Sequence, residues 1–163
     1  MKSPRLTKHR QRKNALFFIS LKIILRDKNG AVLLLKAKKT STLAGYYDLP
    51  GGKIREGEEK DPLSKTIRRE LQEEIGRVRY KLKPDIVAVS RHFYISKKTN
   101  IKQNLFWILF EADYEGGQIK ISNEHVAYKW VRLTKKNIYT YLTEGSLEGI
   151  QSYFRRKPYV PPR

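Results

Sequence analysis

The segment that most constrains this chain is residues 49–76, which read LPGGKIREGEEKDPLSKTIRRELQEEIG. A glycine turn opens the segment, an amphipathic pattern closes it, and acidic residues run through both parts. The chain holds 35 Lys and Arg but only 16 Asp and Glu, and eight of those 16 acids lie between residues 48 and 76. A basic chain that gathers half of its carboxylates in one segment is expected to bind cations there, because hard divalent cations prefer oxygen ligands.

The second half of the segment predicts a helix. Asp61 suits the N-cap, and Pro62 suits the first helical position, where its missing N–H costs nothing. Gly76 supplies the stop signal. Apolar residues recur every four positions and predict one buried stripe, which consists of Leu63, Ile67, Leu71 and Ile75.

Three acids of this helix, Glu70, Glu73 and Glu74, are spaced i, i+3, i+4 and therefore share one flank beside the stripe. Like charges at this spacing weaken an isolated helix by a few tenths of a kcal/mol per pair, so a compensating cation is expected. The alternative is a solvated charged face. The preceding turn, residues 50–52, favours a metal site, because a glycine carbonyl can approach a metal without a Cβ in the way.

Taken together, these residues resemble the signature of the Nudix hydrolase family: a Gly, a Glu six residues on, then Arg-Glu-aliphatic-x-Glu-Glu-x-Gly. Here the positions are filled by Gly52, Glu58 and residues 69–76, and Tyr47 stands where many members carry Trp. One departure is visible. Ten residues separate Glu58 from Arg69, which is three more than is usual in the family. The extra residues fall in the loop and at the start of the helix.

The resemblance implies an α/β fold, the Nudix-type α/β/α sandwich with a mixed β-sheet between helices. It also implies hydrolysis of a nucleoside diphosphate linked to another group, with Mg²⁺ or Mn²⁺ as cofactor. Such ions neutralise the charge on the phosphate oxygens and lower the pKa of the attacking water. Glu70 and Glu74 are expected as the main metal ligands, with Glu73 and the carbonyl of Gly52 assisting.

Two further catalytic roles follow from the same resemblance. Arg69 lies four residues before Glu73 and is expected to orient the glutamates by a charge-assisted hydrogen bond. The general base is either Glu70 or Glu124, which lies in a late loop before Trp130, where members of the family often carry a carboxylate. The alternative for Glu124 is an ordinary surface residue.

Composition predicts a single domain. With 163 residues and 39% apolar content, the chain can bury one core, and we assign residues 14–157 to the domain, 1–13 to a basic flexible arm and 158–163 to a Pro-rich tail. No run approaches the 18 apolar residues that a membrane span needs, and we find no secretory signal, so a cytoplasmic location is the simplest interpretation. The chain has no cysteine, which excludes disulfides and thiolate metal sites.

The pattern outside the helix predicts mostly strands. Residues 15–25 and 31–35 are expected to form a hairpin around Asn29-Gly30. Residues 78–82 and 86–94 are expected as two strands broken at Pro84-Asp85, 105–111 as a central strand and 118–121 as a short extended segment. Residues 136–156 are expected as one or two amphipathic helices broken near Gly145.

Candidate substrate-binding residues lie in and beside these strands. Residues 90–94 combine a guanidinium, an imidazole and two aromatic rings, which suits stacking on a base and holding a phosphate. From this set we select Arg91 and Tyr94, and we add Tyr47 beside the glycine turn. The alternative is that these are ordinary half-buried sheet residues.

Three functions remain in competition. The first choice is a MutT-like enzyme that cleaves a nucleoside or deoxynucleoside triphosphate to the monophosphate and pyrophosphate. The second is a pyrophosphohydrolase acting on the 5′ end of RNA, which the net charge of +19 and the basic arm favour. The third is a catalytically silent Nudix-fold module that binds RNA or a protein. ADP-ribose and dinucleoside polyphosphates stay open as substrates, and the sequence does not specify an oligomeric state.

Overall fold

The computed structural model describes residues 13–39, 45–96 and 99–156. The predicted arm, except Lys13, and the predicted Pro-rich tail lie outside the described residues. The elements occur in the order β1 (Phe18–Arg26), β2 (Val32–Ala37), β3 (Tyr47–Asp48), α1 (Leu63–Ile75), β4 (Arg79–Ile95), β5 (Lys102–Gly116), β6 (His125–Val131), α2 (Ile138–Tyr141) and α3 (Glu144–Arg156).

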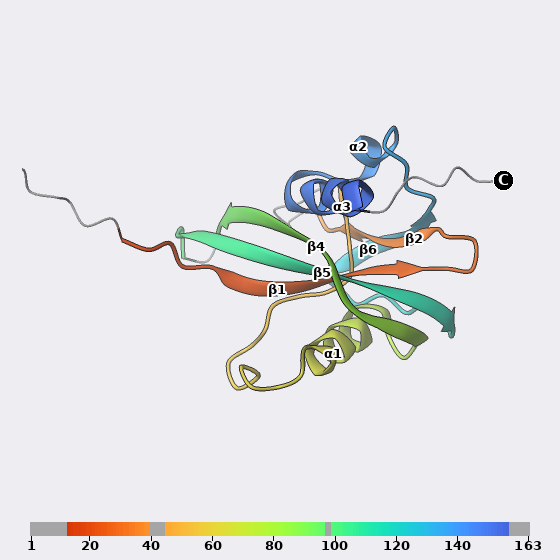
Figure 1. Cartoon of the computed structure of the whole chain (residues 1–163), viewed down its shortest axis with the longest axis horizontal. Coiled ribbons are helices and arrows are strands. Elements are labelled where there is room, and N and C mark those ends of the chain that lie inside the picture. The colour runs from red at the N-terminus through yellow and green to blue at the C-terminus, as the bar shows by residue number, and fades with distance from the viewer. Residues whose placement is uncertain (1–12, 40–44, 97–98, 157–163) are drawn as a thin grey trace, which may run out of the picture.

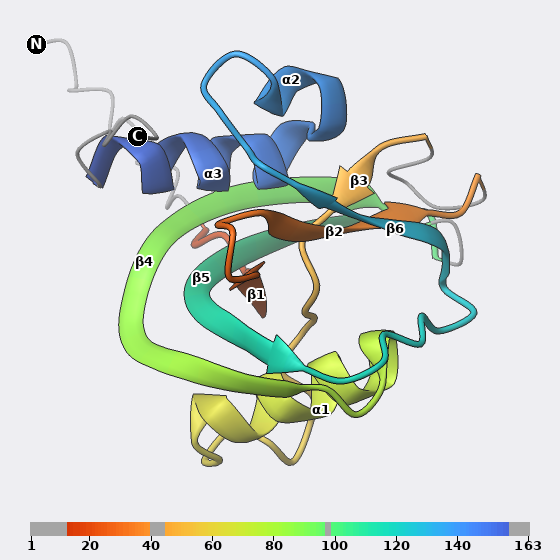
Figure 2. The same cartoon turned by 90° about the vertical axis from the view of Figure 1, so that its right-hand side faces the viewer.

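A six-stranded mixed sheet lies between two layers of helix. Helix α1 covers one face, and α2 and α3 cover the other (Figures 1 and 2). One hydrophobic cluster joins α3 to the sheet through residues such as Trp107 and Ile150. A second cluster joins α1 to the opposite face through Ile67, Leu71 and Ile75. The predicted α/β/α sandwich is therefore confirmed. Among the described residues, no helix is long and apolar enough to cross a bilayer.

Five strands follow the order β3-β2-β1-β5-β4. Strands β1 and β3 pair with different parts of one edge of β2, and β6 pairs with the opposite edge. Strands β1 and β5 run parallel along their whole shared length, from the pair Phe18 and Leu105 to the pair Arg26 and Asp113. Helices cover both faces of β1, which explains why consecutive residues from Ser20 to Leu25 are buried. The predicted central strand 105–111 is confirmed within β5.

The predicted turn between β1 and β2 is confirmed, with Gly30 at a φ of +78°. The two strands form a much shorter hairpin than the sequence suggests, because their register holds only the pair Arg26 and Val32. Where β2 diverges, the glycine turn replaces it beside β1: Leu21 N donates to Gly52 O at 2.8 Å and Ile23 N to Pro50 O at 2.9 Å. The separation of β1 from β2 thus makes room for the turn.

Strand β4 corrects one prediction. Residues 78–82 and 86–94 do not form two strands, because β4 continues from Arg79 to Ile95 with its register shifted between Leu82 and Ile86. Proline is tolerated in a strand at such an irregularity, so Pro84 bends the strand without ending it. Figure 2 shows β4 and β5 curving from the α1 side of the molecule to the α3 side. The expected extended segment 118–121 forms no strand.

The helix boundaries differ slightly from expectation. Pro62 occupies the N-cap position of α1, and the carboxylate of Asp61 pairs with Lys65 at 2.9 Å instead of capping the helix. The first residue of the predicted stripe, Leu63, is 36% exposed. Gly76 ends the helix as predicted, at a φ of +81°. The break in the C-terminal region falls between α2 and α3, before Gly145, which lies inside α3.

The glycine turn allows a direct stability test. Gly51 has a φ of +125°, and a Cβ there would overlap the carbonyl oxygen of Leu21, whereas Gly57 has a φ of +89° with open space around it. We expect Gly57→Ala to lower the free energy of unfolding by about 1–2 kcal/mol through backbone strain alone. Gly51→Ala adds a backbone clash and is expected to cost more than about 3 kcal/mol. Urea unfolding measures both, and equal losses would contradict this account of the turn.

Candidate active site

A buried lysine holds the glycine turn in place. Lys22, only 7% exposed, donates hydrogen bonds from Nζ to Asp48 Oδ2 at 2.7 Å and to the carbonyl oxygens of Leu49 and Gly51 at 3.1 Å. Burial lowers the pKa of Lys22, but the negative charges of Asp48, Glu74 and Glu70 and the hydrogen bond to Asp48 together outweigh it, so the pKa is raised. Asp48 also accepts a hydrogen bond from Ser146 Oγ of α3 at 2.6 Å. The turn is thereby fixed to β1 and to α3.

Two glutamates of α1 are buried against this turn. Glu70 and Glu74 are 7% and 9% exposed. The backbone N–H of Gly51 donates to Glu74 Oε2 at 2.7 Å. A Cβ on Gly52 would overlap the carboxylate of Glu70, so the missing side chain of this glycine is what lets Glu70 reach the turn. The structure therefore brings Gly52, Glu70 and Glu74 together.

Arg69 and Glu58 form a bidentate ion pair in spite of the longer spacer. Arg69 Nε lies 2.6 Å from Glu58 Oε1, and Nη2 lies 2.9 Å from Oε2. Arg69 Nη1 also donates to Glu70 Oε1, and Nη2 donates to the carbonyl of Lys53 at 3.1 Å. The ten intervening residues fold back, so Glu58 lies beside α1 as the family pattern implies. Arg69 thus links the loop, the turn and the helix.

The pKa values of Glu58 and Glu70 are shifted in opposite directions, because Arg69 dominates at Glu58 and burial dominates at Glu70. The hydrogen bonds from Arg69 lower the pKa of Glu58 from 4.5 to about 2. Burial raises the pKa of Glu70, and the hydrogen bond from Arg69 opposes that shift. Glu58 therefore stays ionised across the neutral range, whereas Glu70 takes up a proton more readily than an ordinary glutamate.

Glu73 contacts Arg69 Nη1 at 3.4 Å, as expected, but pairs mainly with Arg55. Arg55 holds both of its carboxylate oxygens, Nη1 to Oε1 at 3.0 Å and Nη2 to Oε2 at 2.6 Å. Within the described ranges, no three His, Cys, Asp or Glu side chains converge as a metal cage. The donor chemistry still fits a hard divalent cation, because Glu70 and Glu74 are acidic oxygen donors buried beside the Gly52 turn. Glu73 can join them only if Arg55 releases it.

The residue that lies beside the helix is His125, the first residue of β6, and not Glu124 of the preceding loop. Glu124 is exposed, and its backbone N–H bonds to Ser122 Oγ at 3.3 Å. His125 Nε2 lies 3.3 Å from Glu74 Oε1. Sequence reasoning missed His125, although it follows the selected glutamate directly. It also missed Lys22, whose signal is a single lysine within the apolar run of β1.

The three candidate substrate residues do not form one group. Tyr94 lies next to the turn, because Lys53 Nζ donates to its hydroxyl at 2.9 Å, and its ring stacks on His92 with centroids 6.4 Å apart. Arg91 is exposed and, by strand alternation, lies on the opposite face of β4 from Tyr94. Tyr47 packs edge-on against Tyr141 of α2, with centroids 6.0 Å apart.

Comparisons with known proteins agree with this geometry. The family model described as NUDIX domain matches residues 17–145. The crystal structure of a MutT protein from Methanosarcina mazei Go1 is similar with a TM-score of 0.64 and 27% identity, covering 86% of this chain and 91% of that chain. The crystal structure of a MutT NUDIX hydrolase from Burkholderia pseudomallei has a TM-score of 0.56 and 22% identity, covering 83% of this chain and 99% of that chain. The crystal structure of a C. elegans Ap4A hydrolase has a TM-score of 0.58 and 20% identity, covering 85% of this chain and 96% of that chain. No curated protein matches the sequence.

The Glu58 pair predicts a specific acid sensitivity. Because folding lowers the pKa of Glu58 from 4.5 to about 2, the ionised carboxylate stabilises the fold above pH 4.5, and this contribution is lost as the pH falls toward 2. We expect Glu58→Gln to flatten the decline of the unfolding free energy over that range, measured by urea unfolding at each pH. Glu56→Gln, a change at an exposed neighbour, is the control. A decline as steep in Glu58→Gln as in the wild type would contradict the pairing.

Proposed function

The chain belongs to the NUDIX domain family and is a hydrolase of phosphorus anhydrides, and from that premise we propose that it converts a nucleoside or deoxynucleoside triphosphate to the monophosphate and pyrophosphate. In this reaction a water oxygen bonds to phosphorus, one P–O–P linkage breaks, and pyrophosphate leaves with the bridging oxygen. The proton of the water passes to a base of the protein.

The observation that carries the proposal is the burial of Glu70 and Glu74 against the Gly51–Gly52 turn. The burial of two neighbouring carboxylates lowers the stability of the fold. Such an arrangement is typical of a functional site. A silent binding module has no need of them, and a basic surface would suffice for its partner. The bidentate pairing of Arg69 with Glu58 supports the same conclusion, since it forms in spite of the longer spacer.

The proposed cofactor is Mg²⁺ or Mn²⁺, held by Glu70 and Glu74 with Glu73 and the carbonyl of Gly52 assisting. When bound, the ion supplies charge neutralisation for the phosphate oxygens and lowers the pKa of water. The chain's own residues prepare the site. Arg69 fixes the position of the Glu70 carboxylate, and Lys22 holds the turn.

Of the two candidates for the base, we propose Glu70. Its carboxylate is buried against the Gly52 turn, within the proposed site, where a base must lie to reach the attacking water. Glu124 is exposed, and we propose that it acts as a surface residue of the loop before His125.

This choice is tested by matched glutamate variants. With a panel of nucleoside triphosphates, ADP-ribose and dinucleoside polyphosphates, and with Mg²⁺ or Mn²⁺, we expect Glu70→Gln to lower kcat/KM at least about a hundredfold, equivalent to several kcal/mol of transition-state stabilisation. Glu124→Gln should lose less than about tenfold, and Glu59→Gln serves as the control for charge. Product analysis identifies the bond that is cleaved. Equal, slow turnover of every compound by the wild type and Glu70→Gln would refute the enzymatic proposal.

A second candidate function, hydrolysis at the 5′ end of RNA, is favoured by two groups of aromatic rings and lysines, which strand alternation puts on opposite faces of β4. Lys53 lies 5.3 Å from the ring centroids of both Phe18 and Tyr94. Lys102 lies 4.2 Å from the ring centroid of Phe93, which is 59% exposed. Exposed rings interleaved with lysines are typical of surfaces that bind single-stranded nucleic acid.

Salt dependence separates the two substrates. If a 5′-triphosphorylated RNA is the substrate, its KM should rise steeply between about 50 and 200 mM salt, because each neutralised phosphate of the strand adds to the slope. For a free nucleoside triphosphate the rise should be shallow. We expect the shallow dependence, together with a higher kcat/KM for the free nucleotide. A steep rise and a preference for the RNA would transfer the assignment to the second candidate.

A further inference from the structure

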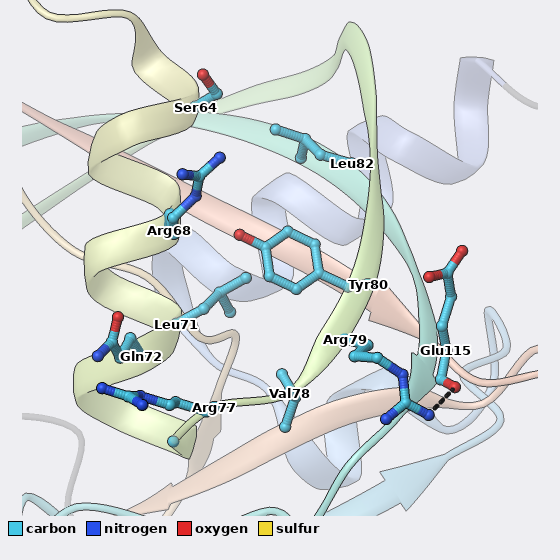
Figure 3. Close-up of a pocket in the computed structure, with 11 residues that line it drawn as sticks. Ser64, Arg68, Leu71, Gln72, Arg77, Val78, Arg79, Tyr80, Leu82 and Glu115 are labelled. Atoms are coloured by element: carbon cyan, nitrogen blue, oxygen red, sulfur yellow. Dashed lines mark hydrogen bonds between the residues drawn. The ribbon is translucent and has the colours of Figure 1, made fainter.

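A groove of about 610 Å³ lies between α1 and the first half of β4, away from the Gly51–Gly52 turn. Figure 3 shows the Tyr80 hydroxyl pointing toward Arg68, to which it is hydrogen-bonded, with Arg77 beside Gln72 near the C-terminal end of α1. Arg79 also borders the groove, but its guanidinium extends away from Tyr80 and lies over β5, where Nη2 donates to the carbonyl oxygen of Glu115 at 3.4 Å. Arg68 and Arg77 are therefore the guanidinium groups of the groove beside α1.

The groove is separate from the candidate active site. Successive residues of a helix are rotated by about 100°, so Arg68 and Gln72 lie on one side of the buried stripe of α1 and Glu70 and Glu73 lie on the other side. Arg69 carries the contacts to Glu58 and Glu70, while its neighbour Arg68 lines the groove. The helix thus presents an acidic flank to the turn and a basic flank to the groove.

The lining combines positive charge with an aromatic and aliphatic floor. Of its residues only Glu115 is acidic, and it contacts Arg79 through its backbone carbonyl. Tyr80, Leu71 and Val78 form the floor, and the ring of Tyr80 is half buried. Guanidinium groups recognise phosphate by charge-assisted hydrogen bonds, and an aromatic ring offers a stacking surface for a base. The volume falls in the range of small-molecule sites.

We propose that this groove is a second binding site, for a nucleotide whose phosphates contact Arg68 and Arg77 and whose base packs on Tyr80. The site is independent of the cleavage reaction and requires no metal. It differs in this respect from the Glu70 and Glu74 site, where the glutamates repel phosphate unless a cation is bound. Removal of divalent ions therefore isolates the groove.

The test is a titration of the full chain with ATP in the presence of EDTA, followed by calorimetry and by ¹H–¹⁵N NMR. We expect saturable binding, with amide shifts at Arg68, Gln72, Arg77 and Tyr80. Inorganic triphosphate should bind at least about tenfold more weakly because it lacks the base. Arg68→Gln/Arg77→Gln should weaken ATP binding at least about tenfold, since it removes two charge-assisted contacts to phosphate.

Arg132→Gln/Arg155→Gln, which removes the same charge from exposed positions outside the groove, is the matched control and should bind ATP like the wild type. Equal affinity in the two double variants would overturn the proposal, as would shifts confined to the Gly52 turn or no binding in EDTA. Inorganic triphosphate binding as tightly as ATP would overturn the nucleotide assignment. So would capture of an RNA oligonucleotide but not ATP, which would point to a polynucleotide. This experiment measures binding without divalent ions and not hydrolysis. A negative result would therefore refute the second site and would not bear on the proposed hydrolase activity.

Discussion

The structure depends on the burial of two carboxylates against a glycine turn. An ion removed from water costs several kcal/mol unless charge and hydrogen bonds compensate it. Here the Gly51 N–H bonds to Glu74, Arg69 bonds to Glu70, and Lys22 places its ammonium under the turn. The same contacts fix the position of α1 against β1. Folding of this region and assembly of the candidate active site are therefore one event, because a shift of the turn or of the helix would leave a buried charge without its partner.

Sequence reasoning succeeded where the determinants are short in range. The four-residue apolar repeat gave α1, Gly76 gave its end, and Asn29-Gly30 gave the turn between β1 and β2. It failed where distant pairing decides. Pro84 reads locally as a break, but pairing with β5 on both sides carries β4 through it. The partners of Lys22 lie 26 to 29 residues away, and the capture of Glu73 by Arg55 depends on how the loop folds back. No local pattern encodes these contacts.

Helix α1 carries acidic side chains on the side that faces the turn and an arginine on the side that faces the groove. Its acidic flank faces the turn and its basic flank faces the groove, although Arg68 and Arg69 are adjacent in sequence. In a chain with a net charge of +19, the clustered glutamates form a local negative site within a positive field. Such a field attracts nucleotides in general, while the acidic flank admits their phosphates only together with a cation. The separation of the two flanks explains how one helix can serve two sites with opposite requirements for metal.

The central claim is that Glu70 and Glu74 beside the Gly51–Gly52 turn bind a divalent ion. Mn²⁺ binding followed by electron paramagnetic resonance, in the absence of nucleotide, measures this directly. The account predicts saturable binding to the wild type and a loss of affinity of at least about tenfold in Glu74→Gln, with Glu115→Gln unchanged. Equal Mn²⁺ affinity in the wild type and Glu74→Gln, or no binding to the wild type, would contradict it.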